Sequence, residues 1–281
     1  MRVDKRWSRV RWIAAGVLLL GATVATAGTW MRSEDESYYS MRLEYETADT
    51  LWNKNWERES MPCTANNWKL SQIYEYGLSY YHTAFGTLDL LDRNCDGYDV
   101  SGLGDLELGI RSRLDIFRNG RTWEVAAILP SGYSTSGKAR LGNDRFGLRL
   151  GAFGRFAGQP RRGGEEGVAL ELGGNLHIWE GDASEQLSAS GKVTLPVWQR
   201  SRLFGALEGD YALINRHAAA VDTSINPPIQ YGYDKLTGRL GFTTKISRSW
   251  SLTLEGASVI IGRNTSDANT FIVGISRDFR E

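Results

Sequence analysis

The chain has 281 residues, and its 33 basic side chains balance its 33 acidic ones, so the formal net charge is zero. Such a balance gives no electrostatic basis for binding nucleic acid or an anionic surface. Hydrophobic residues make up 41% of the chain and charged residues 23%, and beyond the N-terminus no segment approaches the ~20 apolar residues of a membrane-spanning helix. A helical membrane protein is therefore excluded.

The N-terminal segment has the three parts of a secretory signal peptide. Basic residues recur through MRVDKRWSRVRW, the apolar run Ile13–Ala25 follows, and Ala25-Thr26-Ala27 is a small-residue cleavage site. A single N-terminal membrane helix is the alternative, but the apolar run is shorter than the ~20 residues that span a bilayer. We therefore predict that residues 1–27 are a signal peptide and that residues 28–281 form the mature domain.

Twelve segments along the rest of the chain alternate apolar and polar residues with a period of two, which is the pattern of a β-strand with one apolar face. In chain order the predicted strands are Tyr38–Thr47, Trp68–His82, Thr83–Asp92, Leu103–Phe117, Thr122–Pro130, Asp144–Phe156, Gly167–Glu180, Glu185–Val197, Ser201–Ile214, Tyr231–Ile246, Trp250–Ile261 and Asn269–Phe279. The dipeptide Asn119-Gly120 favours a tight hairpin turn between two of them.

The alternation is clearest in Leu103–Phe117, where acidic and basic residues stand between the apolar residues Leu106, Leu108, Ile110, Leu114 and Ile116. At roughly fifteen residues, this segment is far longer than the usual strand of about five or six. A transmembrane barrel strand needs about nine to eleven residues, with apolar side chains toward lipid and polar ones toward a wet lumen. We therefore predict an all-β fold, a transmembrane antiparallel up-and-down β-barrel of about 12 strands.

The connections between the predicted strands support this topology. The odd-numbered connections, which are mostly long, are Ala48–Asn67, Arg93–Ser101, Ser131–Asn143, Gly181–Ser184, Asn215–Gln230 and Gly262–Ala268. The even-numbered ones fall near Thr83, at Arg118–Arg121, at Ala157–Glu166, around Arg200 and at Ser247–Ser249. Outer-membrane barrels place long loops outside the cell and short turns in the periplasm. Both chain termini are therefore predicted to be periplasmic.

Aromatic residues gather near both predicted ends of the strands, as in the interfacial belts of membrane proteins. Near the even-numbered connections are Phe117, Trp123, Phe156, Trp198 and Trp250, and near the odd-numbered ones are Tyr45, Phe146, Trp179, Tyr211 and Phe271. Ordinary packing is the alternative for each residue taken singly. The last predicted strand ends on Phe279, which resembles the terminal signal that barrel assembly machinery reads, although Arg280 and Glu281 follow it.

The two cysteines, Cys63 and Cys95, fall in the first two predicted long loops. The topology puts both on one side of the membrane in an oxidising compartment, which favours a disulfide between these loops over two free thiols. No cluster of Cys or His offers the further ligands of a metal site.

The second of these loops, LDRNCDGYD, is rich in oxygen ligands of the kind that bind calcium, at Asp92, Asn94, Asp96 and Asp99. The segment lacks the acidic twelfth position and the flanking helices of an EF-hand, so a solvated acidic loop is the favoured interpretation. No metal and no other cofactor is predicted.

The functional information lies in the side chains that are expected to face the lumen. These are Glu75, Asp105, Glu107, Arg111, Arg113, Asp115, Arg145, Arg149, Arg155, Glu171, His177, Lys192, Glu208, Asp210, Arg239 and Lys245. Charged residues of this kind can form the lining of a selective channel. They can equally pair across neighbouring strands into a network that plugs a narrow barrel. Both possibilities stay open, with a conducting lumen slightly favoured.

An enzyme is not predicted. Of the histidines His82, His177 and His217, only His177 is expected to face the lumen, beside Glu171. A Ser-His-acid or metal site would have to converge on His177, and the sequence has no local signature for one. A hydrogen-bonded lumen histidine is therefore favoured over a catalytic one.

Three successive segments resemble the family of outer-membrane transporter-like barrels called "MetA pathway of phenol degradation". SGLGDLELGIRSRL is followed by a strand ending in ILPSGY and then by LGNDRFGLRLGAF. The positions that match the family pattern are Gly102, Leu103, Gly104, Asp105, Leu129, Pro130 and Gly132, with Ser131 in place of the usual Thr. The resemblance covers roughly a third of the chain and implies an outer-membrane barrel associated with passage of hydrophobic compounds. Similar small barrels also resemble the outer-membrane components that accompany exopolysaccharide synthesis, and the resemblance implies no catalytic residue.

The sequence therefore predicts a passive pore or transporter for small or hydrophobic solutes in the outer membrane of a Gram-negative bacterium. The alternative is a non-conducting structural or exopolysaccharide-export-associated barrel, and a membrane-embedded hydrolase is a weaker one. The expected partners are outer-membrane lipid, the barrel assembly machinery and a small-molecule or polysaccharide solute, with no nucleic acid.

Overall fold

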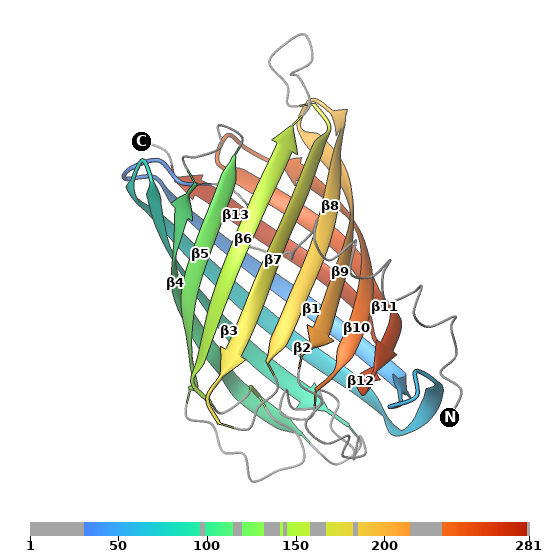
Figure 1. Ribbon diagram of the computed structural model, residues 1–281. Coiled ribbons are helices and arrows are strands. Elements are labelled where there is room, and N and C mark those ends of the chain that lie inside the picture. Colours follow the sequence, from blue (N-terminus) through green and yellow to red (C-terminus); the bar gives the residue numbers. More distant parts are fainter. Residues whose placement is uncertain are drawn as a thin grey trace, which may run out of the picture.

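The computed structural model describes residues 31–95, 99–114, 120–131, 141–142, 145–157, 167–181, 185–213 and 232–279. These residues form one antiparallel sheet that closes on itself into a twelve-stranded barrel, with one further short strand at its rim (Figure 1). No helix among the described residues is long and apolar enough to cross a membrane.

The twelve barrel strands follow one another around the barrel in chain order, and the short β12 lies outside this order, beside β1. They are β1 (Ser37–Trp52), β2 (Arg58–Ser79), β3 (His82–Asn94), β4 (Val100–Arg113), β5 (Arg121–Leu129), β6 (Gly147–Ala157), β7 (Ala169–Trp179), β8 (Gln186–Trp198), β9 (Ser201–Ala212), β10 (Asp234–Lys245), β11 (Trp250–Arg263), β12 (Thr265–Ser266) and β13 (Asn269–Phe279). The predicted all-β fold and its twelve barrel strands are thus confirmed.

The barrel closes through β1, which pairs with both the second and the last strand. Leu43 lies opposite Leu70 of β2 on one side and opposite Val273 of β13 on the other. The short β12 pairs with the end of β1, where Leu51 lies opposite Ser266. Closure leaves no unpaired sheet edge, which is the condition for strands to cross hydrocarbon.

Alternation along the strands gives the barrel an apolar outer face and a polar inner face. Leu240 on β10 points outward and is 71% exposed, whereas Glu75 on β2 is 0% exposed and Arg111 on β4 only 1%. The predicted faces hold along β2 and β5, where Tyr74 and Trp123 are exposed while Glu75 and Thr122 are buried.

The segment Ala48–Asn67, which the sequence analysis assigned to a loop, is mostly strand. β1 continues to Trp52 and β2 begins at Arg58, so that only Asn53–Glu57 connects them. Across this extension Trp52 pairs with Arg58, and the register shifts between Ala48 and Thr50. The prediction failed because polar residues predominate from Asp49 to Ser60, so that apolar side chains do not recur there at every second position.

Short connections share one end of the barrel, which we call the short-turn end. Tyr80–Tyr81 joins β2 to β3, Gln199–Arg200 joins β8 to β9, and Ile246–Ser249 joins β10 to β11. The extended β1–β2 hairpin, β12 and the connection from β3 to β4 lie at the opposite end, which we call the hairpin end. In Figure 1 the short-turn end is at the top, and the β1–β2 hairpin lies at the lower right.

Several of the predicted belt aromatics are exposed on the outer face. Trp123, Phe156 and Trp198 are near the short-turn end, and Phe146, Tyr211 and Phe271 are near the hairpin end. Trp179 departs from the prediction, because it is buried and packs with Ile128. Phe117 lies outside the described residues.

Candidate pore lumen

The inner face of β2 to β6 carries a chain of buried ion pairs. Arg111 donates from Nη1 to Oε1 of Glu75 and from Nε to Oε2 of Glu124, at 3.1 Å each. Arg149 on β6 continues the chain, since its guanidinium pairs with both Glu124 and Glu107. Each charge in this inner-wall network has an opposite charge in contact, as buried charges require.

Phe85 and two glycines complete the packing of the network. The guanidinium carbons of Arg111 and Arg149 lie 5.4 and 5.6 Å from the centroid of the Phe85 ring, within the range of cation–π attraction. A β-carbon on Gly109 would come within 2.4 Å of that ring, and one on Gly151 within 2.4 Å of Oδ1 of Asn175. Glycine at these two positions leaves the room that the Phe85 ring and the Asn175 side chain occupy.

The N-terminal segment just before β1 lies against this network. Arg32 donates from Nε to Oε2 of Glu75 at 2.7 Å and from Nη1 to Oδ1 of Asp278 at 2.9 Å. The carbonyl oxygen of Ser33 passes so close to Gly77 that a β-carbon there would be 1.8 Å from it. The segment therefore crosses the inner face of β2 near the short-turn end, and a predicted cleavage before Gly28 would leave it in the mature chain.

A second series of ion pairs spans the opposite wall. Arg239 on β10 pairs with Glu208 on β9 and with Glu255 on β11, at 2.7 Å each. Glu255 also accepts from Arg42 on β1 at 3.2 Å. Side chains thus join β9, β10 and β11 to one another and, across β13, to β1, in addition to the backbone ladders.

Longer and less buried ion pairs also lie toward the two ends of the barrel. At the hairpin end, Lys69 lies 3.4 Å from Asp89 and Lys235 lies 3.6 Å from Asp210. At the short-turn end, Glu171 lies between Arg155 and Lys192, at 3.9 and 3.6 Å. We call the space that these groups and the two series of ion pairs surround the candidate pore lumen.

Most of the residues expected in the lumen are on inward positions of the strands. Those in the ion pairs above are Glu75, Glu107, Arg111, Arg149, Arg155, Glu171, Lys192, Glu208, Asp210 and Arg239. Asp105, Arg113 and Lys245 share the inward alternation of β4 and β10. Asp115 lies outside the described residues.

Arg145 lies elsewhere than predicted, and His177, although on the inward alternation of β7, has other neighbours than expected. Arg145 precedes β6, and its Nη1 donates to the carbonyl of Glu180 at 3.0 Å, which places it at the hairpin-end rim. His177 and Glu171 are on the same strand, β7, but are not adjacent in it. The cross-strand neighbours of His177 are Arg149 and Gln186.

Several members of the ion-pair series were missed in the sequence, among them Arg42, Glu124 and Glu255. Each is a charged residue between outward-facing apolar ones, as Glu124 is between Trp123 and Val125. The alternation that predicted the other lumen residues therefore also marks these. Arg32 could not be found in this way, because it precedes the first strand.

The predicted disulfide between Cys63 and Cys95 is confirmed, with the two α-carbons 5.6 Å apart. Its place differs from the prediction, because Cys63 is within β2 and Cys95 directly follows β3. Cys95 belongs to a small apolar cluster with Ala48, Ala65, Val259 and Ala268, against which Trp52, Met61 and Cys63 pack. The bridge therefore fastens the β1–β2 hairpin to the barrel at the hairpin end.

The described residues contain no group of three or more His, Cys, Asp or Glu side chains placed to hold a metal ion. Asp96, one of the oxygen ligands considered in the second loop, lies outside the described part of the chain.

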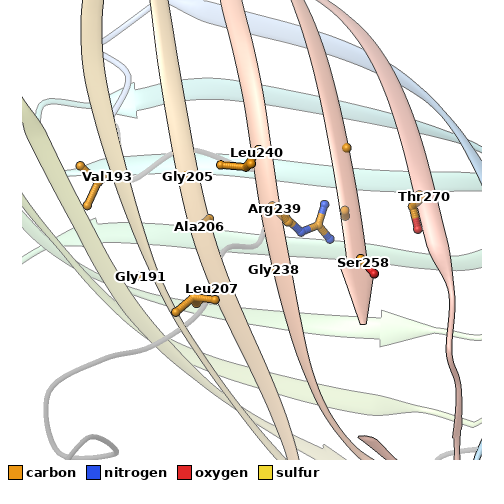
Figure 2. Close-up of a pocket in the computed structure, with 12 residues that line it drawn as sticks. Gly191, Val193, Gly205, Ala206, Leu207, Gly238, Arg239, Leu240, Ser258 and Thr270 are labelled. Atoms are coloured by element: carbon orange, nitrogen blue, oxygen red, sulfur yellow. The ribbon is translucent and has the colours of Figure 1, made fainter. Parts of the chain in front are cut away.

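A groove of about 710 Å³ lies along β8 to β11, and Figure 2 shows its lining residues. Glycines 191, 205, 238 and 256 alternate there with exposed leucines, since Leu207 lies opposite Gly238 and Leu240 opposite Gly256. These positions share the outward alternation of their strands. The glycines and leucines of the groove are thus on the outer face of the barrel wall, whereas Arg239, which also lines it, belongs to the interior ion pairs.

The two parts of the sequence pattern that resembles the phenol-degradation barrels are in contact. The hydroxyl of Ser131, which follows β5, donates to the carbonyl of Leu103 on β4 at 2.9 Å. No family model matches the chain, and no curated protein matches it either. The resemblance to that particular family therefore stays a prediction.

Several solved barrel structures are similar to this chain. The crystal structure of the COG4313 outer membrane channel from Pseudomonas putida F1 is similar with a TM-score of 0.69 at 16% identity, over 92% of this chain and 100% of that chain. The translocator domain of autotransporter NalP from Neisseria meningitidis has a TM-score of 0.47 at 13% identity, over 98% and 95% of the two chains. The KdgM porin has a TM-score of 0.47 at 11% identity, over 86% and 99%. The similarity to the first of these structures shows that the chain has the barrel fold of an outer-membrane channel.

Proposed function

We propose that this protein is a passive outer-membrane pore for small hydrophilic solutes. The observation that carries the proposal is the contrast between the two faces of the closed barrel. The outward face bears exposed side chains such as Leu207 and Leu240, whereas opposite walls of the interior bear ionised groups such as Arg111 and Arg239. An apolar exterior with a polar interior is the arrangement of barrels that conduct water-soluble molecules.

The charged interior disfavours the passage of hydrophobic compounds through the lumen, which the family resemblance implied. An apolar solute in contact with Arg239 or Glu208 would displace the water that is hydrogen-bonded to these charged side chains. The solute cannot replace those hydrogen bonds, so the desolvation is costly. A hydrophilic solute can exchange hydrogen bonds with the same groups. Small polar or charged molecules are therefore the proposed solutes.

A non-conducting structural or exopolysaccharide-associated barrel is the second candidate function. The inner-wall network of Glu75, Arg111, Glu124 and Arg149 favours it, because these side chains fill one side of the interior. Arg32 adds to the filling near the short-turn end. In either case we expect the outer membrane of a Gram-negative bacterium as the location, its lipids and the assembly machinery as partners, and no catalytic role.

Swelling of proteoliposomes tests the pore directly. The folded state is first verified by the different gel mobility of boiled and unboiled protein, and the vesicles are then diluted into solutions of sugars of increasing size. A pore predicts swelling rates above those of protein-free vesicles that fall as the sugar becomes larger. Rates equal to those of protein-free vesicles, from a correctly folded barrel, would favour the structural candidate.

A further inference from the structure

Arg277 is a basic residue on the outer face of the barrel, close to the short-turn end. It is on β13, two residues before the end of that strand. Successive side chains of a strand point to opposite faces of the sheet, and the next residue, Asp278, points inward, where it pairs with Arg32. The side chain of Arg277 therefore points outward, as does the exposed Phe279 at the end of the strand.

Three aromatic residues on other strands are in register with Arg277. Arg277 lies directly opposite Trp250 on β11 and directly opposite Tyr39 on β1. Tyr39 in turn lies opposite Tyr74 on β2, which is 51% exposed. Residues opposite one another on paired strands share a face of the sheet, and outward Tyr and Trp residues gather at the headgroup level of a bilayer. Arg277 is therefore at the level where lipid headgroups are expected.

The guanidinium of Arg277 lies over two aromatic rings. Its central carbon is 4.2 Å from the centroid of the Phe279 ring and 5.3 Å from that of the Trp250 ring, within the range of cation–π attraction. The rings attract the cation through their faces, but they do not supply the oxygen acceptors that the N–H groups of a guanidinium require. The two rings thus fix the position of the charge and leave its hydrogen-bonding capacity for another group.

No described residue accepts a hydrogen bond from the Arg277 side chain. Its Nε is buried without a partner among the described residues, and none of their ion pairs includes Arg277. The inner-wall arginines differ in this respect, since Arg111 contacts both Glu75 and Glu124. Because Arg277 is partly exposed on the outer face, an anionic acceptor can approach its guanidinium from the bilayer.

Apolar side chains continue from Arg277 toward the middle of the barrel wall. Ile275 lies opposite Leu252, and Val273 lies opposite Leu254, on the same outward alternation of β13 and β11. A molecule with an anionic group at Arg277 can therefore place hydrocarbon against these residues. This combination of a fixed cation and an adjoining apolar surface matches the two parts of a phospholipid.

We infer that Arg277, together with Trp250 and Phe279, binds the phosphate of a glycerophospholipid. Arginine donates two parallel hydrogen bonds to a phosphate group, and the charges of the two groups are complementary. Outer-membrane barrels place their short turns in the periplasm, so the lipid belongs to the periplasmic leaflet. The site is on the outside of the barrel, and its occupancy goes beyond the proposed pore function and does not depend on it.

Native mass spectrometry of the purified, folded barrel, titrated with phosphatidylglycerol in detergent, tests the inference through the affinity for the first bound lipid. Arg277→Gln is expected to weaken that affinity at least about tenfold, because charge-assisted hydrogen bonds to the phosphate are lost. The matched control is Arg200→Gln, which removes one charge from an exposed position in the β8–β9 turn at the same end. The control is expected to bind the lipid as the wild type does.

Two further probes identify which part of the lipid is recognised. Diacylglycerol with the same acyl chains lacks the phosphate and is expected to bind the wild type much more weakly than phosphatidylglycerol does. Inorganic phosphate lacks the chains and is expected not to displace the lipid. The unboiled gel mobility of each variant verifies that it is folded.

The outcomes are distinct from those that test the pore. A loss of affinity in Arg277→Gln that the control does not share would support the inference. Equal affinities in the wild type and Arg277→Gln, or an equal loss in the two variants, would overturn it. Diacylglycerol binding as tightly as phosphatidylglycerol would also overturn it, because the phosphate would then contribute nothing. Displacement of the lipid by inorganic phosphate would overturn the assignment to a lipid. Conduction by the barrel has no bearing on any of these results.

Discussion

Arg111 on β4 donates to Glu75 on β2 at 3.1 Å, across the intervening strand β3, and both side chains are almost completely buried. The pair is one link in a series that extends from Arg32 before β1 to Arg149 on β6. Side chains far apart in the sequence therefore connect strands that are not neighbours, on the inner side of the barrel wall. The backbone hydrogen bonds connect only neighbouring strands.

Glu124 is the link whose loss is expected to cost most stability. Glu124→Gln leaves Arg111 and Arg149 without one of their carboxylates in a buried site, and breaking a buried pair in this way costs about 3–5 kcal/mol. Glu171→Gln is the matched control, because its ion pairs are longer and it is less buried. The measurement is the temperature at which the unboiled, folded gel band disappears. Equal temperatures for the two variants would show that the network does not stabilise the barrel.

The disulfide is expected to stabilise the hairpin end. Cys63→Ser with Cys95→Ser removes a bridge between residues 32 apart in sequence, which in the chain-entropy model is worth about 3–4 kcal/mol. The double variant should unfold at lower denaturant concentration than the wild type, and the reduced wild type should behave like the variant. Unfolding curves that coincide with and without reductant would contradict this.

The cost of a charged side chain on the outward face is expected to increase with its depth in the bilayer. Leu240→Arg, near the middle of β10, places a cation toward the bilayer centre and should cost about 2–4 kcal/mol, whereas the same change near an interface costs about 0–1 kcal/mol. Leu213→Arg, just beyond the end of β9 and also exposed, is the matched interfacial variant. Denaturant titrations in lipid vesicles compare the two. A larger loss for Leu213→Arg than for Leu240→Arg would mean that the membrane lies elsewhere on the barrel.

The N-terminal segment is expected to narrow the mouth at the short-turn end. Arg32→Ala removes the contacts with Glu75 and Asp278 that hold the segment against β2, so the single-channel conductance should increase. Lys54→Ala, an exposed residue in the connection at the tip of the β1–β2 hairpin, removes one positive charge at the other end and serves as control. An Arg32→Ala conductance equal to that of the wild type and of the control would show that the segment does not restrict passage.

The sequence alone was sufficient for the barrel, because an alternation of period two specifies both a strand and its two faces. It predicted β13 with the bounds that the structure has, and the start of β11 at Trp250. It failed for the β1–β2 hairpin beyond Ala48, where polar residues predominate and the apolar residues Leu51 and Trp52 are adjacent rather than alternating. The local alternation of apolar and polar residues was therefore enough to predict the twelve strands and which side chains on them point outward.

The candidate lumen was only half predictable from the sequence. Alternation marks which charges point inward, but the pairing of Arg111 with Glu75 depends on strand register, which no local pattern contains. The separation of His177 from Glu171 shows the same limit, because two inward residues of one strand can lie at opposite ends of it. The position of Arg32 depends on tertiary contacts alone.

Single-channel recording of the purified, refolded wild-type protein in a planar bilayer tests the central claim most directly. A pore lined by these charged groups predicts discrete, steady current steps, with a conductance that changes when Arg149 and Arg155 are neutralised. Complete silence from protein that shows the folded gel mobility would contradict the claim, and would mean that the inner-wall network and the N-terminal segment close the barrel.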